Sequence, residues 1–178
     1  LLSTSYLSHS ELLQMNTKYI SGELKDQTLR SLLHERLRFG CYMTHVLLWE
    51  HMLHRRLDFI IVFEDDVILT TDFAVKIRNI IIQLPQNWGI LYLNGTERKF
   101  GGKHSDGIFQ SRGGVGAFAY AISREAVEYF LSGPARKSDK PVDHVMNEAV
   151  LSGRVLAYHA KPELASLVLN MRSTLAYK

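Results

Sequence analysis

Apolar side chains recur at helical spacing in two long parts of the chain. The first is a stripe at intervals of three and four residues, widened by Trp49, and it predicts a helix with one core-facing side formed by Leu37, Cys41, His45, Leu48 and Met52. The second predicts a helix over residues 73–84, which begins after Thr71 or Asp72 and ends before Pro85. Both helices are expected to pack on a sheet.

Short apolar runs bounded by turn residues predict the strands of that sheet. Such runs are found at residues 59–63 (FIIVF), 89–93 (GILYL), 108–110 (IFQ), 117–122 (AFAYAI) and 155–159 (VLAYH). Residues 96–107 are polar and contain two adjacent glycines, and we expect them to form a mobile loop.

Two further helices follow from local signals. Ser123 is a typical N-cap, and Gly133 a typical stop, for a helix around residues 126–131, while Pro141 favours a helix start at residues 142–151. Strands that alternate with helices in this way predict an α/β domain in layers around a mostly parallel sheet.

Size and composition indicate one globular domain over residues 1–178. A mass of 20.3 kDa with 46% hydrophobic and 22% charged residues supports a packed core and excludes a disordered or collagen-like chain. No apolar run approaches the length of a membrane span. The net charge of +3 is spread along the chain, so we expect no nucleic-acid partner, although the excess suits a phosphate-bearing ligand or an anionic membrane surface.

The only cysteine, Cys41, excludes an internal disulfide and a cysteine-based zinc cluster. The N-terminal residues LLS carry neither an initiator methionine nor a signal-peptide pattern, as expected of a chain processed or trimmed from a longer protein.

Three consecutive acids, Glu64, Asp65 and Asp66, directly follow the uncharged strand at residues 59–63. They repel one another unless they are solvated, partly protonated or neutralised by a metal ion. Ligands of open α/β sheets bind beyond the carboxyl ends of the strands. Strand alternation places Glu64 and Asp66 on one face as an oxygen-ligand pair for a divalent ion, with Asp65 on the other. The alternative is an ordinary polar exit from a strand.

Other candidate residues have two interpretations each. Asp143 lies in the first turn of a predicted helix, where it either acts as a base or only stabilises the helix dipole. His144 either shares that role or is a surface side chain. His45 is either a ligand or a hydrogen-bonded core residue. Asn94, with Gly95, either borders a ligand or forms a turn.

The glycine cluster at residues 113–116 matches neither a P-loop nor a dinucleotide fingerprint. Its glycines instead allow the backbone to approach a ligand closely.

Four segments together resemble glycosyltransferase family 25, which contains lipooligosaccharide and collagen galactosyltransferases. They span about residues 36–165 and are Gly40-Cys41-x-x-Thr44-His45 with Trp49, Phe63-Glu64-Asp65-Asp66-Val67, Gly114-x-Gly116-Ala117-Phe118-Ala119-Tyr120-x-Ile122-Ser123-Arg124, and Pro141-Val142-Asp143-His144. The chain departs from the family pattern in two places. It has no Ile-Asn-Leu strand before residue 36, and it has Thr44 where the family has serine.

The resemblance implies a three-layer type-A glycosyltransferase fold, the Rossmann-like fold of nucleotide-diphospho-sugar transferases. It also implies a site with Asp66, Glu64 and His159 on a metal ion, His45, Thr44, Glu64, Asp65, Asn94 and Gly114 on the nucleotide sugar, and Asp143 with His144 as the catalytic base.

The activity implied by the resemblance is Mn²⁺- or Mg²⁺-dependent, inverting transfer of a hexose. The expected donor is UDP-galactose, and the acceptor is a hydroxyl of a glycan, a lipid-linked saccharide or a hydroxylysine peptide. The enzyme is then expected at the cytoplasmic membrane surface in a bacterium or in the ER lumen in a eukaryote. Two alternatives are a non-catalytic sugar-nucleotide or carbohydrate-binding module and a metal-dependent phosphodiester hydrolase, although the latter usually needs more His and Asp ligands.

Overall fold

A computed structural model describes residues 27–95, 98–135 and 140–168. Contacts divide the chain into two compact units, residues 1–44 with 170–178, and residues 45–169. The first unit is described only by the beginning of helix α2 (Gln27–His54), which confirms the helix predicted from the apolar stripe. Whether the chain is one domain stays a prediction.

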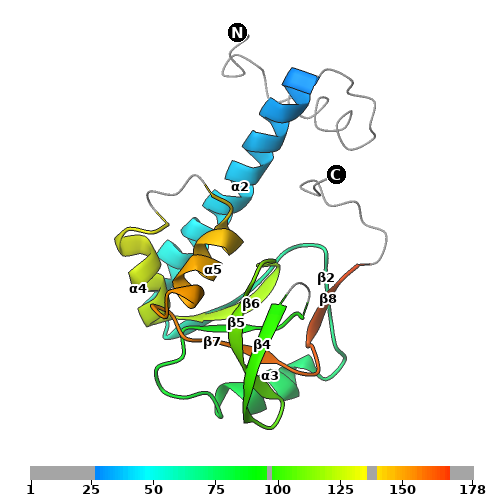
Figure 1. Ribbon diagram of the computed structural model, residues 1–178, viewed down its shortest axis with the longest axis vertical. Helices are drawn as coiled ribbons and strands as arrows, with labels where there is room; N and C mark the ends of the chain where they lie inside the picture. Colours follow the sequence, from blue (N-terminus) through cyan, green and yellow to red (C-terminus); the bar gives the residue numbers. More distant parts are fainter. Residues whose placement is uncertain (1–26, 96–97, 136–139, 169–178) are drawn as a thin grey trace. The chain divides into compact units, whose positions relative to one another are not determined.

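The second unit is a layered α/β structure (Figure 1). Its main sheet has six strands in the order β1-β6-β3-β7-β5-β4, with bounds β1 Phe59–Phe63, β3 Ile90–Tyr92, β4 Arg98–Ser105, β5 Ile108–Gly114, β6 Ala119–Ser123 and β7 Ala157–Ala160. A small second sheet pairs β2 (Val67–Leu69) with β8 (Ala165–Leu167). The remaining helices are α3 (Phe73–Ile81), α4 (Arg124–Ser132) and α5 (Val142–Leu151).

The main sheet is mostly antiparallel, so the prediction of a mostly parallel sheet was wrong. Of the five strand pairings that the structure describes in it, only β3 with β7 is parallel. A parallel sheet needs a crossover helix between successive strands, and β4, β5 and β6 follow one another without one. The α/β class and the layered arrangement agree with the prediction.

The segment expected to be a loop at residues 96–107 forms strand β4 from residue 98 onward. It pairs with β5 across a tight turn at Asp106 and Gly107, where Gly107 adopts φ 74°. The strand has three register irregularities and lies at the edge of the sheet. Its sequence, RKFGGKHS, lacks apolar alternation because most of its side chains remain exposed.

The sheet has a helical layer on each face. Helix α3 packs Ile77 and Ile80 into a cluster with Leu91 and Ala121, while α4 and α5 cover the opposite face (Figure 1). The strand register also aligns one row of side chains across the sheet. This row consists of Val62, Tyr120, Tyr92, His159 and Phe109. Trp49 of α2 stacks on Phe130 of α4 within the second unit.

Local capping signals placed α4 and α5 correctly. The Ser123 side chain accepts a hydrogen bond from the Ala126 N–H at 3.3 Å, Gly133 is the C-cap of α4, and Pro141 precedes α5. By contrast, Leu48 is 40% exposed, and the buried side of this part of α2 runs through Trp49 instead. No helix within the described ranges is long and apolar enough to cross a membrane.

Candidate functional site

The three acids form a turn between the two sheets. Strand β1 ends at Phe63, Glu64 follows outside the strand, and Asp65 and Asp66 turn the chain into β2. Because the three acids lie outside the strand, strand alternation does not determine the directions of their side chains. The prediction that Glu64 and Asp66 share one face, with Asp65 on the other, therefore does not apply. The Glu64 N–H donates to the Phe118 carbonyl at 2.8 Å, and the Asp66 carbonyl accepts from the Val168 N–H at 2.9 Å. Backbone contacts on both sides thus hold the acid turn, residues 64–66.

Asp66 has the electrostatic character of a cation ligand. Its Oδ1 atom is buried and has no hydrogen-bond partner among the described residues. Burial raises the pKa of this carboxyl, and the negative charges of Glu64 and Asp65 raise it further, against a smaller opposing effect of its own backbone. A divalent cation would supply a partner for the buried oxygen and offset the repulsion within the turn. Carboxylate oxygens such as those of Asp66 and Glu64 are the ligand type that Mn²⁺ and Mg²⁺ prefer.

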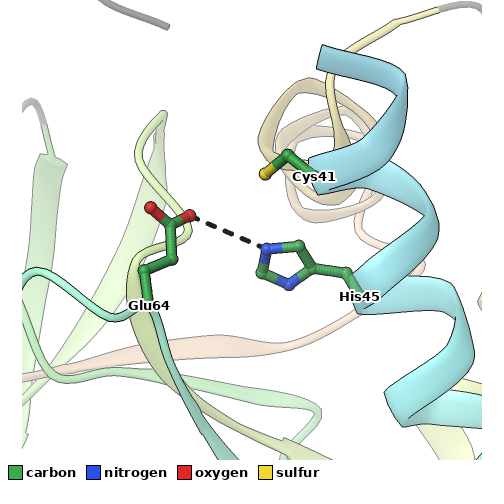
Figure 2. A group of neighbouring side chains, drawn as sticks. All are labelled: Cys41, His45 and Glu64. Carbon is green, nitrogen blue, oxygen red and sulfur yellow. Dashed lines mark ion pairs between the residues drawn. The ribbon is translucent and has the colours of Figure 1, made fainter. Parts of the chain in front are cut away.

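His45 lies beside the acid turn. Its Nε2 atom is 3.7 Å from Oε1 of Glu64, and its ring is only 3% exposed. Figure 2 shows the ring directed at the Glu64 carboxylate. Cys41, drawn in the same figure, precedes it by one turn of α2. On the other side of the ring, Nδ1 lies 2.8 Å from the hydroxyl of Tyr120, and the two rings stack. His45 is thus a buried, hydrogen-bonded histidine whose other nitrogen faces a predicted site residue, and its contact with a nucleotide stays a prediction.

The glycine cluster is bound to the start of α5. The Gly116 N–H donates to Oδ2 of Asp143 at 2.9 Å, and the Gly114 N–H donates to Oδ1 of Asn147 at 2.8 Å. Positive φ angles of 93°, 127° and 92° at Gly113, Gly114 and Gly116 exclude most other residues from this loop. The other Asp143 oxygen accepts from the His144 N–H at 2.9 Å. Asp143 therefore anchors the glycine loop through its side chain, independently of its predicted role as a base.

Asn94 lies next to the same loop. A Cβ atom at Gly116 would be 3.8 Å from its Nδ2 atom. The side chain is fully buried, and neither amide atom has a hydrogen-bond partner among the described residues. Buried amides are nearly always hydrogen-bonded, so Asn94 is suited to contact a polar ligand.

His159 lies within an aromatic stack on β7. Its ring stacks on Tyr92, with centroids 5.4 Å apart, and contacts Phe100, with centroids 4.7 Å apart. It is fully buried. Nothing in these contacts brings it to the acid turn, and its role as a metal ligand stays a prediction.

Three other predicted residues are exposed. The Thr44 hydroxyl donates to the Gly40 carbonyl within α2 at 2.9 Å. Asp65 and His144 point away from the core. Their predicted contacts with nucleotide or acceptor remain predictions.

Residues 113–118 connect the predicted site residues to one another. Glu64 hydrogen-bonds to this segment through its backbone, Asp143 through its side chain, and Asn94 lies next to Gly116. The sequence analysis missed Tyr120 and assigned Trp49 to packing alone. A tyrosine within the apolar strand AYAIS was the available signal, because a buried hydroxyl needs a partner.

Comparison with known proteins identifies the class. The family model described as glycosyltransferase family 25 (LPS biosynthesis protein) matches residues 7–146, which is well over half of the chain. A search of the curated proteins finds no match. The chain belongs to glycosyltransferase family 25, and it is therefore a glycosyltransferase of a family linked to lipopolysaccharide biosynthesis.

Proposed function

We propose that this glycosyltransferase moves a hexose, most simply galactose from UDP-galactose, to a hydroxyl of a saccharide acceptor with inversion and with the help of Mn²⁺ or Mg²⁺. The observation that carries the proposal is the buried Oδ1 of Asp66, which has no hydrogen-bond partner in the described part of the chain and lies in a turn of three acids. Glu64 would hold the cation together with Asp66. A bound divalent ion stabilises the charge that develops on the departing diphosphate.

The reaction requires one proton transfer. The acceptor oxygen attacks the anomeric carbon as the bond from that carbon to the diphosphate oxygen breaks, and UDP leaves with the bonding electrons. The proton of the acceptor hydroxyl goes to a base, for which we propose Asp143, with His144 adjacent. Each Asp143 oxygen accepts one backbone N–H and has a further lone pair available. The same bonds orient the carboxylate.

The nucleotide sugar would contact the surroundings of residues 113–118. The glycines allow the backbone to approach the donor closely, and Asn94 offers an amide that lacks partners in the described residues. His45, Asp65 and Gly114 complete the proposed donor contacts.

The proposal is tested by release of UDP from UDP-galactose with Mn²⁺, with Mg²⁺ and with EDTA. We expect turnover to need the cation and Asp66→Ala to lower it about 100-fold or more. Asp72→Asn is the matched control, because Asp72 is exposed and its carboxylate lies 2.9 Å from Lys76 Nζ, outside the acid turn. It should keep turnover, since exposed ion pairs contribute little to stability.

Cation binding can be measured without activity. Mn²⁺ should raise the melting temperature of the wild type and of Asp72→Asn but not that of Asp66→Ala. Binding of UDP-galactose without release of UDP, even with acceptors present, would favour a non-catalytic binding module instead. Full turnover in Asp66→Ala would refute the role of the acid turn.

A further inference from the structure

A row of buried polar groups leads from the interior to the acid turn. Trp49 Nε1–H donates to the Tyr120 hydroxyl at 3.1 Å, and this hydroxyl lies 2.8 Å from Nδ1 of His45. The second His45 nitrogen, Nε2, faces Glu64 (Figure 2). Trp49 and Tyr120 are fully buried. All four residues belong to the second unit.

The chemistry of the end groups determines where the imidazole proton lies. Glu64 is an acceptor when ionised, so it favours a proton on the His45 nitrogen that faces it, Nε2. A neutral ring with its proton on Nε2 has Nδ1 as an acceptor. The Tyr120 hydroxyl can donate to that nitrogen while one of its lone pairs accepts the Trp49 N–H.

We propose that Tyr120 is a positioning residue, which Trp49 orients and which fixes the His45 proton on Nε2, so that this N–H is directed at Glu64. Tyr120 itself touches neither donor nor cation. It acts through His45 on the carboxylate of the acid turn. The kinetic part of this inference rests on the proposed function, whereas the location of the proton does not.

NMR reads the proton location directly. In protein labelled with ¹⁵N-histidine, the ring Cδ2–H couples strongly to Nε2, and the nitrogen without a proton is shifted far downfield. His45→Gln identifies the His45 signals, because they alone disappear. We expect the Nε2–H form in the wild type and in Tyr158→Phe, which removes the hydroxyl of another strand tyrosine, and a mixture of both forms in Tyr120→Phe.

Kinetics tests the effect on the acid turn. Tyr120→Phe should raise the apparent KM for Mn²⁺ and donor about 10-fold, while kcat at saturation changes by less than about threefold. Tyr158→Phe should leave both unchanged. The amide nitrogen of glutamine can replace Nε2–H, whereas asparagine reaches only the Nδ1 position, so His45→Gln should retain more activity than His45→Asn.

The outcomes distinguish the positioning role of Tyr120 from the proposed transferase function. A wild-type spectrum with the proton on Nδ1, or on both nitrogens, would overturn the positioning role even in an active enzyme. So would equal KM changes in Tyr120→Phe and Tyr158→Phe. If no variant or wild type turns over any UDP-sugar, the proposed function fails, while the Nε2–H spectrum and its loss in Tyr120→Phe would still support the inference.

Discussion

Replacing Tyr120 by phenylalanine removes one oxygen atom on which two buried groups depend. The Trp49 N–H and the His45 Nδ1 each lose the partner that the structure shows. The two side chains are 0% and 3% exposed, so bulk water cannot replace the hydroxyl without local opening. The substitution changes no other heavy atom, so the resulting loss of stability reports on the contacts of this hydroxyl.

The magnitude follows from the two lost partners. A buried donor or acceptor left unsatisfied costs about 1–3 kcal/mol. The variant no longer has to desolvate the tyrosine hydroxyl on folding, which offsets part of this cost. We therefore expect the free energy of unfolding to fall by about 2–4 kcal/mol. That is a large fraction of a typical folding free energy of about 5–15 kcal/mol. With a urea m-value of about 2 kcal/mol/M, the unfolding midpoint should fall by about 1–2 M.

The assay is urea unfolding followed by circular dichroism. Tyr158→Phe is the matched control, because Tyr158 also lies in a strand of the main sheet and its hydroxyl forms no hydrogen bond with the described residues. We expect this control to change stability by less than about 1 kcal/mol. In the double variant with Trp49→Phe, the loss should be smaller than the sum of the single losses by about 1 kcal/mol. Equal losses in Tyr120→Phe and Tyr158→Phe, or strict additivity, would refute the reasoning.

Three further variants test other contacts. Asp143→Asn keeps an oxygen for the Gly116 N–H but removes the proposed base, so turnover should fall about 100- to 10,000-fold. Asn147→Ala loosens the same glycine loop and should lower turnover less than about tenfold. Equal effects of the two variants would show that Asp143 only anchors the loop. Gly116→Ala should destabilise the fold by about 1–2 kcal/mol because φ is 92°, and Gly133→Ala, with φ −173° and open space around it, should not; thermal melts compare the two. Ser123→Ala should cost about 1 kcal/mol through the lost N-cap of α4 in the same melts, and an unchanged melting temperature would contradict this role.

Features set by a few neighbouring residues were predictable from the sequence. Ser123, Gly133 and Pro141 mark the ends of α4 and α5 because capping depends on residues one turn apart. The acids after β1 were also recognisable. The order of the strands was not, because β1 pairs with β6 about sixty residues later and no local pattern records that choice.

The contacts of the candidate site were less predictable than its residues. Asp143 was a candidate from its position in a first helical turn, yet its bond to Gly116 joins residues that are far apart in the chain. Tyr120 resembled an ordinary core residue because its strand is apolar. Its importance depends on Trp49 and His45, which approach it only after α2 and the sheet have packed.

The position of β7 determines how far the chain can be shortened. The family match ends at residue 146, but β7 lies inside the main sheet between β3 and β5, and β8 pairs with the strand that follows the acid turn. An expression clone cut at the end of the match would leave two interior strand edges bare, and such edges recruit other chains into aggregates. Cloning limits should therefore include residue 168, whose backbone still contacts Asp66.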